Sequence, residues 1–174
     1  DIPISQNKEV NFIVVENTLD ALQQLASFHR KKFNLKTIGI TGSNGKTIIK
    51  EWLYQLLQPD FNIIRSPKSF NSQTGVPLSV WQINNEHNLG IFEAGISTSG
   101  EMQKLEKIIE PEIGVFSNVG EAHSENFTSL DVKIQEKLLL FQHSKTLIYC
   151  KDYSGIHNAV MQSEYFKNGL KCFT

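Results

Sequence analysis

The sequence predicts an α/β fold, a mainly parallel sheet flanked by helices on both faces. Three observations predict it. Short apolar runs alternate with segments whose apolar residues have helical spacing, a glycine-rich turn joins one run to the next helical segment, and polar residues directly follow several runs. Strands buried on both faces read as apolar runs, and such sheets bind ligands beyond the carboxyl ends of their strands. We therefore expect the functional residues at that edge of the sheet.

Seven short runs rich in apolar, β-branched or aromatic residues are the expected strands. Each is bounded by turn-forming or charged residues, which is typical of strands in a buried sheet. In chain order they are residues 10–15, 35–41, 61–66, 88–95, 112–120, 145–150 and 169–174.

Between these runs, apolar residues recur every three or four positions, which predicts helices. The expected helices are residues 17–33, 48–57, 77–83, 99–111, 128–141 and 156–166. Thr18 is the predicted N-cap of the first helix, Pro77 is expected to open the third, and Pro111 to end the fourth. The apolar positions of the second helix are Ile48, Ile49, Trp52, Leu53, Leu56 and Leu57. In the fifth helix, Leu130, Ile134, Leu138 and Phe141 are expected to point inward.

The composition suits one globular domain, or one domain plus a fragment of another. The chain has 174 residues and a formal net charge of −1, which gives no electrostatic case for a nucleic-acid or anionic-membrane partner. No apolar run approaches about 18 residues and no signal-peptide pattern opens the chain, so we predict a soluble, cytoplasmic protein. Cys150 and Cys172 have no histidine pair nearby and are predicted to be buried thiols. Because no Met begins the chain, we expect a piece of a longer protein.

The stretch T-G-S-N-G-K-T predicts a phosphate-binding loop between a strand and a helix. A standard P-loop reads G-x-x-x-x-G-K-S/T, and here Ile40 stands where its first glycine belongs. The mechanism survives the shorter spacing, because backbone N–H groups and the positive end of the helix still form an anion cradle. An incidental lysine in a glycine-rich turn is the simpler alternative, but G-K-T at the first turn of an amphipathic helix favours nucleotide binding. The predicted nucleotide-binding residues are Thr41, Gly42, Ser43, Asn44, Gly45, Lys46 and Thr47.

This loop, "GITGSNGKT", resembles the ATP-binding loop of the Mur ligase family. Three further stretches resemble the family in the same order: "SFNSQTGVPLSVW", "GIFEAGISTSGEM" and "PEIGVFSNVGEAHSENFTSLDVKIQEKLLLF". The resemblance covers about residues 35–150 and implies the P-loop NTPase-like central domain of a Mur ligase. It implies that residues 35–174 are this ATP-binding domain, incomplete, and that residues 1–34 are the end of an N-terminal UDP-sugar-binding domain with its linker. The C-terminal amine-binding domain would be absent, so we expect the fragment alone to be inactive.

The resemblance also implies a reaction. The family transfers the γ-phosphoryl group of ATP to a carboxylate, and an amine then attacks the acyl phosphate. ATP and two Mg²⁺ ions are the implied cofactors. The motifs look most like the member of peptidoglycan precursor synthesis that joins D-alanyl-D-alanine to a UDP-muramoyl-peptide, the tripeptide form. A weaker similarity is to the ligase half of fusions with alanine racemase.

Carried over position by position, the resemblance assigns roles to single residues. Glu93 would hold the first Mg²⁺ with Thr47, and His123 would lie at the second. Lys137 would be the lysine that the family carbamylates with CO₂, after which it helps to hold Mg²⁺, whereas Lys133 is out of register. The implied catalytic residues are Lys46, His123, Lys137 and Asn71.

Each of these residues also has a simpler interpretation: a solvated strand-end glutamate, a surface histidine, an exposed lysine or a turn asparagine. Asn118, at the end of its strand, would either orient the metal site or only terminate the strand.

Three departures from the family pattern leave alternatives open. Ile48 replaces a hydroxyl residue, Gln73 replaces a glutamate, and Tyr149 replaces an asparagine near the adenine. One alternative is another amide-forming ligase of this type, similar to folylpolyglutamate or cyanophycin synthetase. A second is a non-catalytic nucleotide-binding regulatory module.

Overall fold

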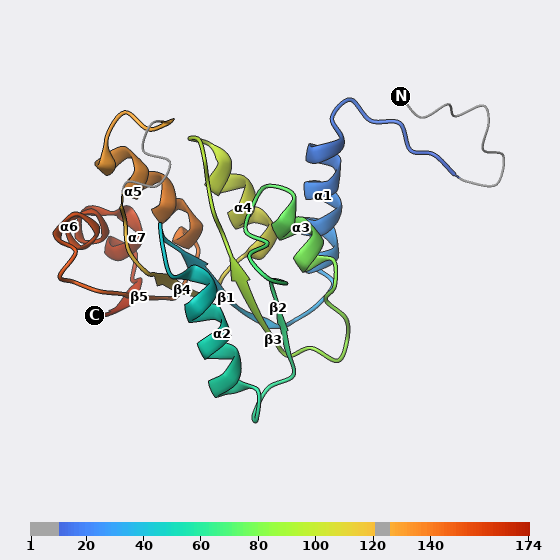
Figure 1. The fold of residues 1–174 in the computed structure, drawn as a ribbon, viewed down its shortest axis with the longest axis horizontal. Helices are drawn as coiled ribbons and strands as arrows, with labels where there is room; N and C mark the ends of the chain where they lie inside the picture. The colour runs from blue at the N-terminus through green and yellow to red at the C-terminus, as the bar shows by residue number, and fades with distance from the viewer. Residues whose placement is uncertain (1–10, 121–125) are drawn as a thin grey trace.

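The computed structural model describes residues 11–120 and 126–174 and confirms the α/β class (Figure 1). One six-stranded sheet has the order β2-β3-β1-β4-β5-β6, and every neighbouring pair is parallel. The strands are β1 Lys36–Thr41, β2 Ile63–Arg65, β3 Leu89–Glu93, β4 Ile113–Phe116, β5 Thr146–Tyr149 and β6 Lys171–Phe173. The three strands at the middle of this order, β3, β1 and β4, all lead into segments that the sequence marks as functional.

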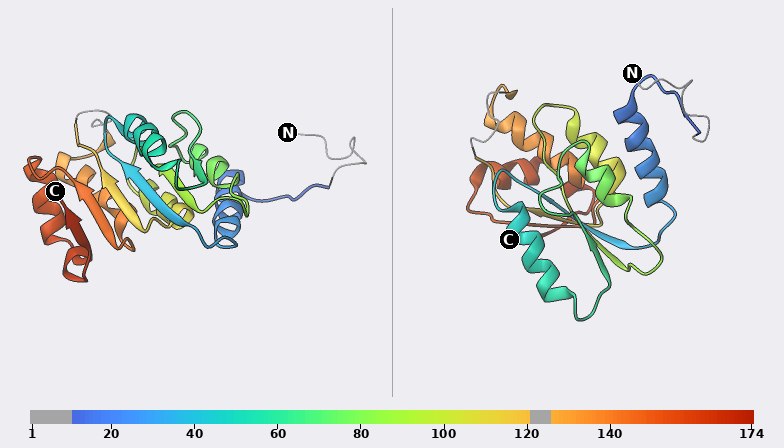
Figure 2. Two further views of the ribbon diagram at one scale, coloured as in Figure 1. Left: turned by 90° about the horizontal axis from the view of Figure 1, so that it is seen from below. Right: turned by 45° about the vertical axis from the view of Figure 1, so that its right-hand side comes forward.

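Helices lie on both sides of the sheet (Figure 2). They are α1 Thr18–Arg30, α2 Lys46–Leu57, α3 Gly75–Val80, α4 Glu101–Ile109, α5 Leu130–Leu138, the 3₁₀ helix η3 Leu139–Phe141, α6 Ser154–Gln162 and α7 Glu164–Lys167. On one face, α2 packs on the small core formed by Ile38, Ile40, Leu89 and Ile91. On the other face, α1, α3, α4, α5, η3 and α6 contribute to the larger core. Successive strand residues serve opposite faces, as Ile91 and Phe92 do, because side chains alternate along a strand.

The structure differs from the predicted elements at four places that affect their identity or capping. Residues 11–15 of the expected strand 10–15 form no strand; they extend away from the body and have no partner strand (Figure 1), while Val10 lies outside the described residues. Asn17, rather than Thr18, caps α1, because its Oδ1 accepts hydrogen bonds from the N–H groups of Leu19 and Asp20 at 2.9 and 3.0 Å. Helix α3 begins at Gly75, two residues before Pro77. The expected helix 156–166 is two helices, because Ser163 has an extended backbone and caps α7.

Burial also differs from the predicted pattern at several positions. The expected apolar face of α2 is divided: Ile49, Leu53 and Leu57 pack on the sheet, whereas Ile48, Trp52 and Leu56 are 56, 64 and 72% exposed. Leu130 is half-exposed, although the other three inward positions of its helix are buried.

The prediction of buried thiols is wrong. Cys150 is exposed just after β5, and Cys172 is half-buried on the edge strand β6.

At the end of the sheet opposite the glycine loop, α1 is anchored by a buried arginine. Arg30 donates hydrogen bonds to the carbonyl oxygens of Ile109, Phe33 and Leu35 at 3.3, 2.9 and 3.0 Å. This joins α1 to α4 and to the segment that leads into β1. The domain boundary near residue 34 stays a prediction. Within the described residues, no helix is long and apolar enough to cross a bilayer.

Candidate active site

The glycine loop leaves β1 and turns into α2 at the carboxyl edge of the sheet. Gly42 has φ 146°, and a Cβ there would lie 1.9 Å from Ser117 Oγ, so only glycine fits. Gly45 has φ 81° and is the N-cap of the 12-residue helix α2, and no side-chain hydrogen bond caps this end of the helix. The backbone therefore presents the N–H groups and the helix dipole that bind a phosphate.

The segment after β4 holds the loop in place. Asn118 accepts from Ser43 N through its backbone oxygen at 2.9 Å and from Asn44 N through Oδ1 at 3.0 Å. Ser117 Oγ donates to Asn44 O at 2.7 Å. In this structure the side chain of Asn118 thus braces the phosphate loop.

Thr47, Glu93 and Asn71 come together beside the loop. Glu93 is the last residue of β3 and is fully buried. Its Oε2 accepts a hydrogen bond from Thr47 Oγ1 at 3.0 Å and one from Asn71 Nδ2 at 3.5 Å. The solvated glutamate that the sequence left open is excluded. Two oxygens of the kind that hard cations prefer lie side by side here.

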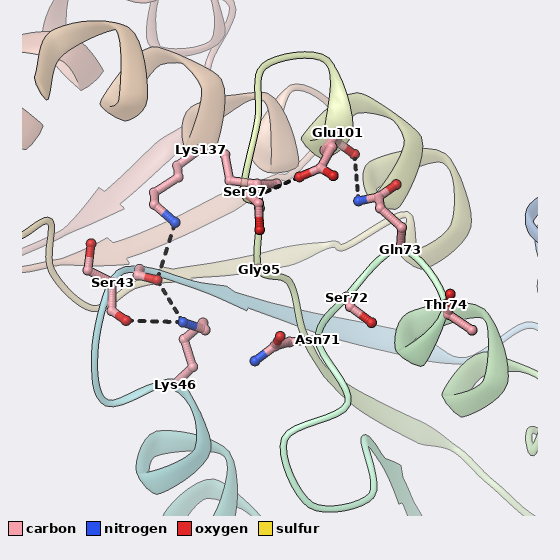
Figure 3. A pocket seen from close by; sticks show the side chains of 12 residues that line it. Ser43, Lys46, Asn71, Ser72, Gln73, Thr74, Gly95, Ser97, Glu101 and Lys137 are labelled. Carbon is pink, nitrogen blue, oxygen red and sulfur yellow. Dashed lines mark hydrogen bonds between the residues drawn. The ribbon is translucent and has the colours of Figure 1, made fainter. Parts of the chain in front are cut away.

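Lys46, from α2, and Lys137, from α5, approach the same carbonyl oxygen (Figure 3). Lys46 Nζ donates to Gly42 O at 2.8 Å and to Ser43 O at 3.3 Å, and Lys137 Nζ, from α5, donates to Gly42 O at 3.3 Å. Lys137 is buried rather than exposed. Burial, together with the charges of Lys46 and Lys133, lowers the pKa of Lys137 to about 7. Burial also lowers the pKa of Lys46; the Glu93 charge opposes that shift and Lys133 adds to it.

Two further buried lysines are Lys133, which sequence reasoning named only as out of register, and Lys50, which it missed. Lys133 Nζ donates to Gly120 O at 2.5 Å, and its position one helical turn before Lys137 was the available signal. Lys50 lies one turn after Lys46 on α2, and its Nζ is 3.0 Å from Glu93 Oε1. Lys133 lies four residues before Lys137, and Lys50 lies four residues after Lys46, so each is one helical turn from a residue already singled out.

A cavity of about 320 Å³ opens in front of the two lysines that share Gly42 O (Figure 3). Its far wall is formed by Gln73, Ser97 and Glu101. Gln73 Nε2 donates to Glu101 O at 3.3 Å, and Glu101 Oε2 accepts from Ser97 N at 2.6 Å. The wall is polar and is held by its own hydrogen bonds, so the cavity has a phosphate end and a second end with donors and acceptors.

The structure does not place the remaining predicted residues in this cluster. His123 lies outside the described residues. Tyr149 is buried, and its hydroxyl group is 2.9 Å from His157 Nδ1. Across residues 11–120 and 126–174, no three His, Cys, Asp or Glu side chains form a metal-binding group. The side chain of Ile48 is exposed, and nothing in the structure explains why it replaces a hydroxyl residue.

Fold and site together define a class: a phosphate-binding-loop domain on a parallel sheet, with buried lysines and the buried carboxylate of Glu93 at the loop. Within this class, the chain belongs to the Mur ligase family. The family model of the Mur ligase middle domain matches residues 40–168 of this chain. Mur ligases use ATP, which fits the loop geometry.

Two curated relatives carry the same name, UDP-N-acetylmuramoyl-tripeptide–D-alanyl-D-alanine ligase. The protein from Borreliella burgdorferi is 37% identical over 134 residues, which cover 77% of this chain and 29% of the relative. The protein from Treponema pallidum is 41% identical over 130 residues, covering 74 and 28%. The chain spans less than a third of the length of either relative.

Solved structures agree in fold. The MurF ligase of Thermotoga maritima in complex with ADP has a TM-score of 0.80 at 29% identity, covering 95% of this chain and 39% of that one. Folylpolyglutamate synthase of Mycobacterium tuberculosis has a TM-score of 0.67 at 9% identity, covering 89 and 46%, a likeness that shows the fold alone.

Proposed function

We propose that this chain is the ATP-binding part of a ligase that joins D-alanyl-D-alanine to UDP-N-acetylmuramoyl-tripeptide in peptidoglycan precursor synthesis. The observation that carries the proposal is that Lys46 and Lys137 line one cavity at the glycine loop, while Thr47 and the buried Glu93 are hydrogen-bonded to each other beside that loop. The names of the two relatives support the choice of substrates. The work of such a ligase takes place on small molecules, without nucleic acid or membrane, and we place it in the cytoplasm.

Amide formation from a carboxylate needs activation, because hydroxide is a poor leaving group. In the proposed reaction an oxygen of the tripeptide carboxylate attacks the γ-phosphorus of ATP, ADP leaves, and the amine of D-alanyl-D-alanine then displaces phosphate from the acyl phosphate. The protein's contribution is to position the reactants and neutralise their charge. We propose that Lys46 and the N–H groups at the start of α2 bind the phosphates. Asn71, with an amide donor beside Glu93, would orient the acceptor end.

Thr47 Oγ1 and Glu93 Oε2 fit a Mg²⁺ ion, because they are adjacent oxygen donors that face the loop. Such an ion, when bound, would neutralise phosphate charge during transfer. We assign the first of two Mg²⁺ ions to this pair and keep His123 as the proposed residue of the second.

We further propose that Lys137 reacts with CO₂. Its neutral amine would attack the carbon of CO₂ and lose a proton, which gives a carbamate anion. Two features support this. A pKa of about 7 leaves a large fraction of the amine neutral at physiological pH. Lys46 and Lys133, which destabilise an ammonium at this position, would become counter-ions of the carbamate.

The test is ADP release by the full-length protein that contains this chain. ATP should be turned over with UDP-muramoyl-tripeptide, and the rate should depend on added D-alanyl-D-alanine. A folylpolyglutamate-type ligase would instead respond to a folate and glutamate. A regulatory module would bind ATP and release no ADP with either substrate pair, and that result would overturn the proposal.

A further inference from the structure

Lys50 is a fully buried cation that the mechanism above does not use. It lies on the sheet-facing side of α2, and burying an ammonium group is costly unless it is paired. Lys50 Nζ donates to Ser66 O at 2.8 Å and to Lys68 O, and it lies 3.2 Å from Glu51 Oε1. These contacts anchor the ammonium group from three sides.

Because of this ammonium group, the two oxygens of the Glu93 carboxylate have different surroundings. Oε1 is 3.0 Å from Lys50 Nζ and accepts no hydrogen bond among the described residues, so it is held by charge. Oε2 faces Thr47 and Asn71 instead. Only one oxygen of the carboxylate is therefore directed toward the proposed cation position.

The charges around Glu93 also affect which cations can bind there. Glu93 and Lys50 lie 3.0 Å apart with opposite charges, and the ammonium group of Lys46 lies at the same loop. A free divalent cation gains little from such a site. A cation that arrives with the phosphates of a nucleotide brings its own counter-charge and further oxygen ligands.

We propose that Lys50 is a positioning residue that reserves a single oxygen of Glu93 for the cation and excludes free divalent cations until nucleotide binds. Mg²⁺ is commonly held by one or two carboxylates plus phosphates and water, whereas Ca²⁺ readily takes both oxygens of one carboxylate. Removing Lys50 should therefore favour Ca²⁺ most. The inference rests on the proposed function, since it takes Glu93 as a cation ligand.

The experiment titrates Ca²⁺ and Mg²⁺, each alone, into the nucleotide-free chain by isothermal calorimetry. The wild type should bind Ca²⁺ no tighter than millimolar. Lys50→Met should bind Ca²⁺ at least ~10-fold tighter, with a smaller gain for Mg²⁺. Lys50→Arg keeps the charge and should behave as the wild type. Glu93→Gln combined with Lys50→Met should abolish the gain, which places it at this carboxylate.

Lys104→Met is the matched control, because Lys104 is a half-exposed lysine paired with Asp20 away from the loop. It should leave cation binding unchanged. Equal Ca²⁺ affinity of Lys50→Met and the wild type would overturn the proposal, as would micromolar binding of free Ca²⁺ by the wild type. Far-UV circular dichroism confirms that each variant is folded, and Lys50→Gln serves as a second neutral variant.

If neither Lys50→Met nor Lys50→Gln folds, nuclear magnetic resonance spectra of the wild type still test the proposal. The amide resonances of Thr47 and Glu93 should stay in place with Ca²⁺ alone and move when ADP is added with it. Movement with Ca²⁺ alone contradicts the proposal. Failure of ADP to bind the wild type at all would count against the proposed function, whereas the comparison of free-cation affinities needs no nucleotide.

Discussion

The two ends of the sheet bury cations in opposite ways. At one end, Arg30 lies among three carbonyl oxygens from two backbone segments, the connection between α1 and β1 and the end of α4. At the other, Lys137 shares a single carbonyl oxygen with Lys46 and lies close to a further lysine. A buried cation with enough acceptors stabilises a fold, whereas buried like charges destabilise it. The difference indicates that Arg30 serves the structure, and it agrees with our proposal that Lys46 and Lys137 belong to a nucleotide site.

The largest expected effect is at the lysine end. Lys46→Ala should weaken ADP binding by at least ~100-fold, or ~2.7 kcal/mol, because a charge-assisted phosphate contact is lost. The free energy of unfolding should stay equal or rise, since one of several like charges is removed. Calorimetry and urea denaturation measure the two quantities. A large loss of stability with unchanged ADP affinity would reverse the comparison.

The next effect is at the arginine end. Arg30→Met should lower the free energy of unfolding by about 2–4 kcal/mol, because several buried carbonyl groups lose their donor. Affinity for ADP should not change, since Arg30 lies at the far end of β1. Urea denaturation measures the first quantity. A variant as stable as the wild type would show that Arg30 is not a structural cation.

The pH dependence of the free energy of unfolding tests whether Lys137 is a destabilising buried cation. The pKa of Lys137 is lowered to about 7 in the folded chain, against about 10.5 when unfolded. Between these values the unfolded state binds more protons, so the contribution of Lys137 to stability should rise with pH, by about 1 kcal/mol per unit near pH 8. In CO₂-free buffer, urea denaturation of the wild type and of Lys137→Met should show this difference. Parallel profiles of the two proteins would contradict the lowered pKa.

The smallest effect concerns an exposed pair that bridges the same two helices as Arg30. Lys104 Nζ is 3.0 Å from Asp20 Oδ1, and both side chains are about half-exposed. Asp20→Asn should change the free energy of unfolding by less than ~0.5 kcal/mol, because water and salt screen such pairs. A cost equal to that of Arg30→Met would show that charge, rather than buried acceptors, holds α1 and α4 together.

Local patterns in the sequence predicted the parts of the site that depend on a short stretch of chain. The loop from Thr41 to Thr47 and the carboxylate of Glu93 at a strand end were both found in this way. The predicted cap at Thr18 failed by one residue, because Asn17 and Thr18 are both suitable caps and only backbone geometry selects between them. The division of the α2 face also escaped prediction, because its apolar residues come in adjacent pairs such as Trp52 and Leu53, and the sequence does not state which member of a pair meets the sheet.

By itself, the sequence determined the class of fold and the phosphate loop, because these follow from periodicities of two and 3.6 residues and from a glycine-rich turn. The roles predicted for Glu93, His123 and Lys137 came from the resemblance to the Mur ligase family. Only the tertiary structure decided that Asn118 braces the loop, that Lys133 is buried beside Lys137 and that Lys50 pairs with Glu93. The physical reason is the strand order: β3 and β4 both pair with β1, and this brings residues from distant segments to one edge. Pairing between distant strands is set by packing of the whole sheet, which no short stretch of sequence encodes.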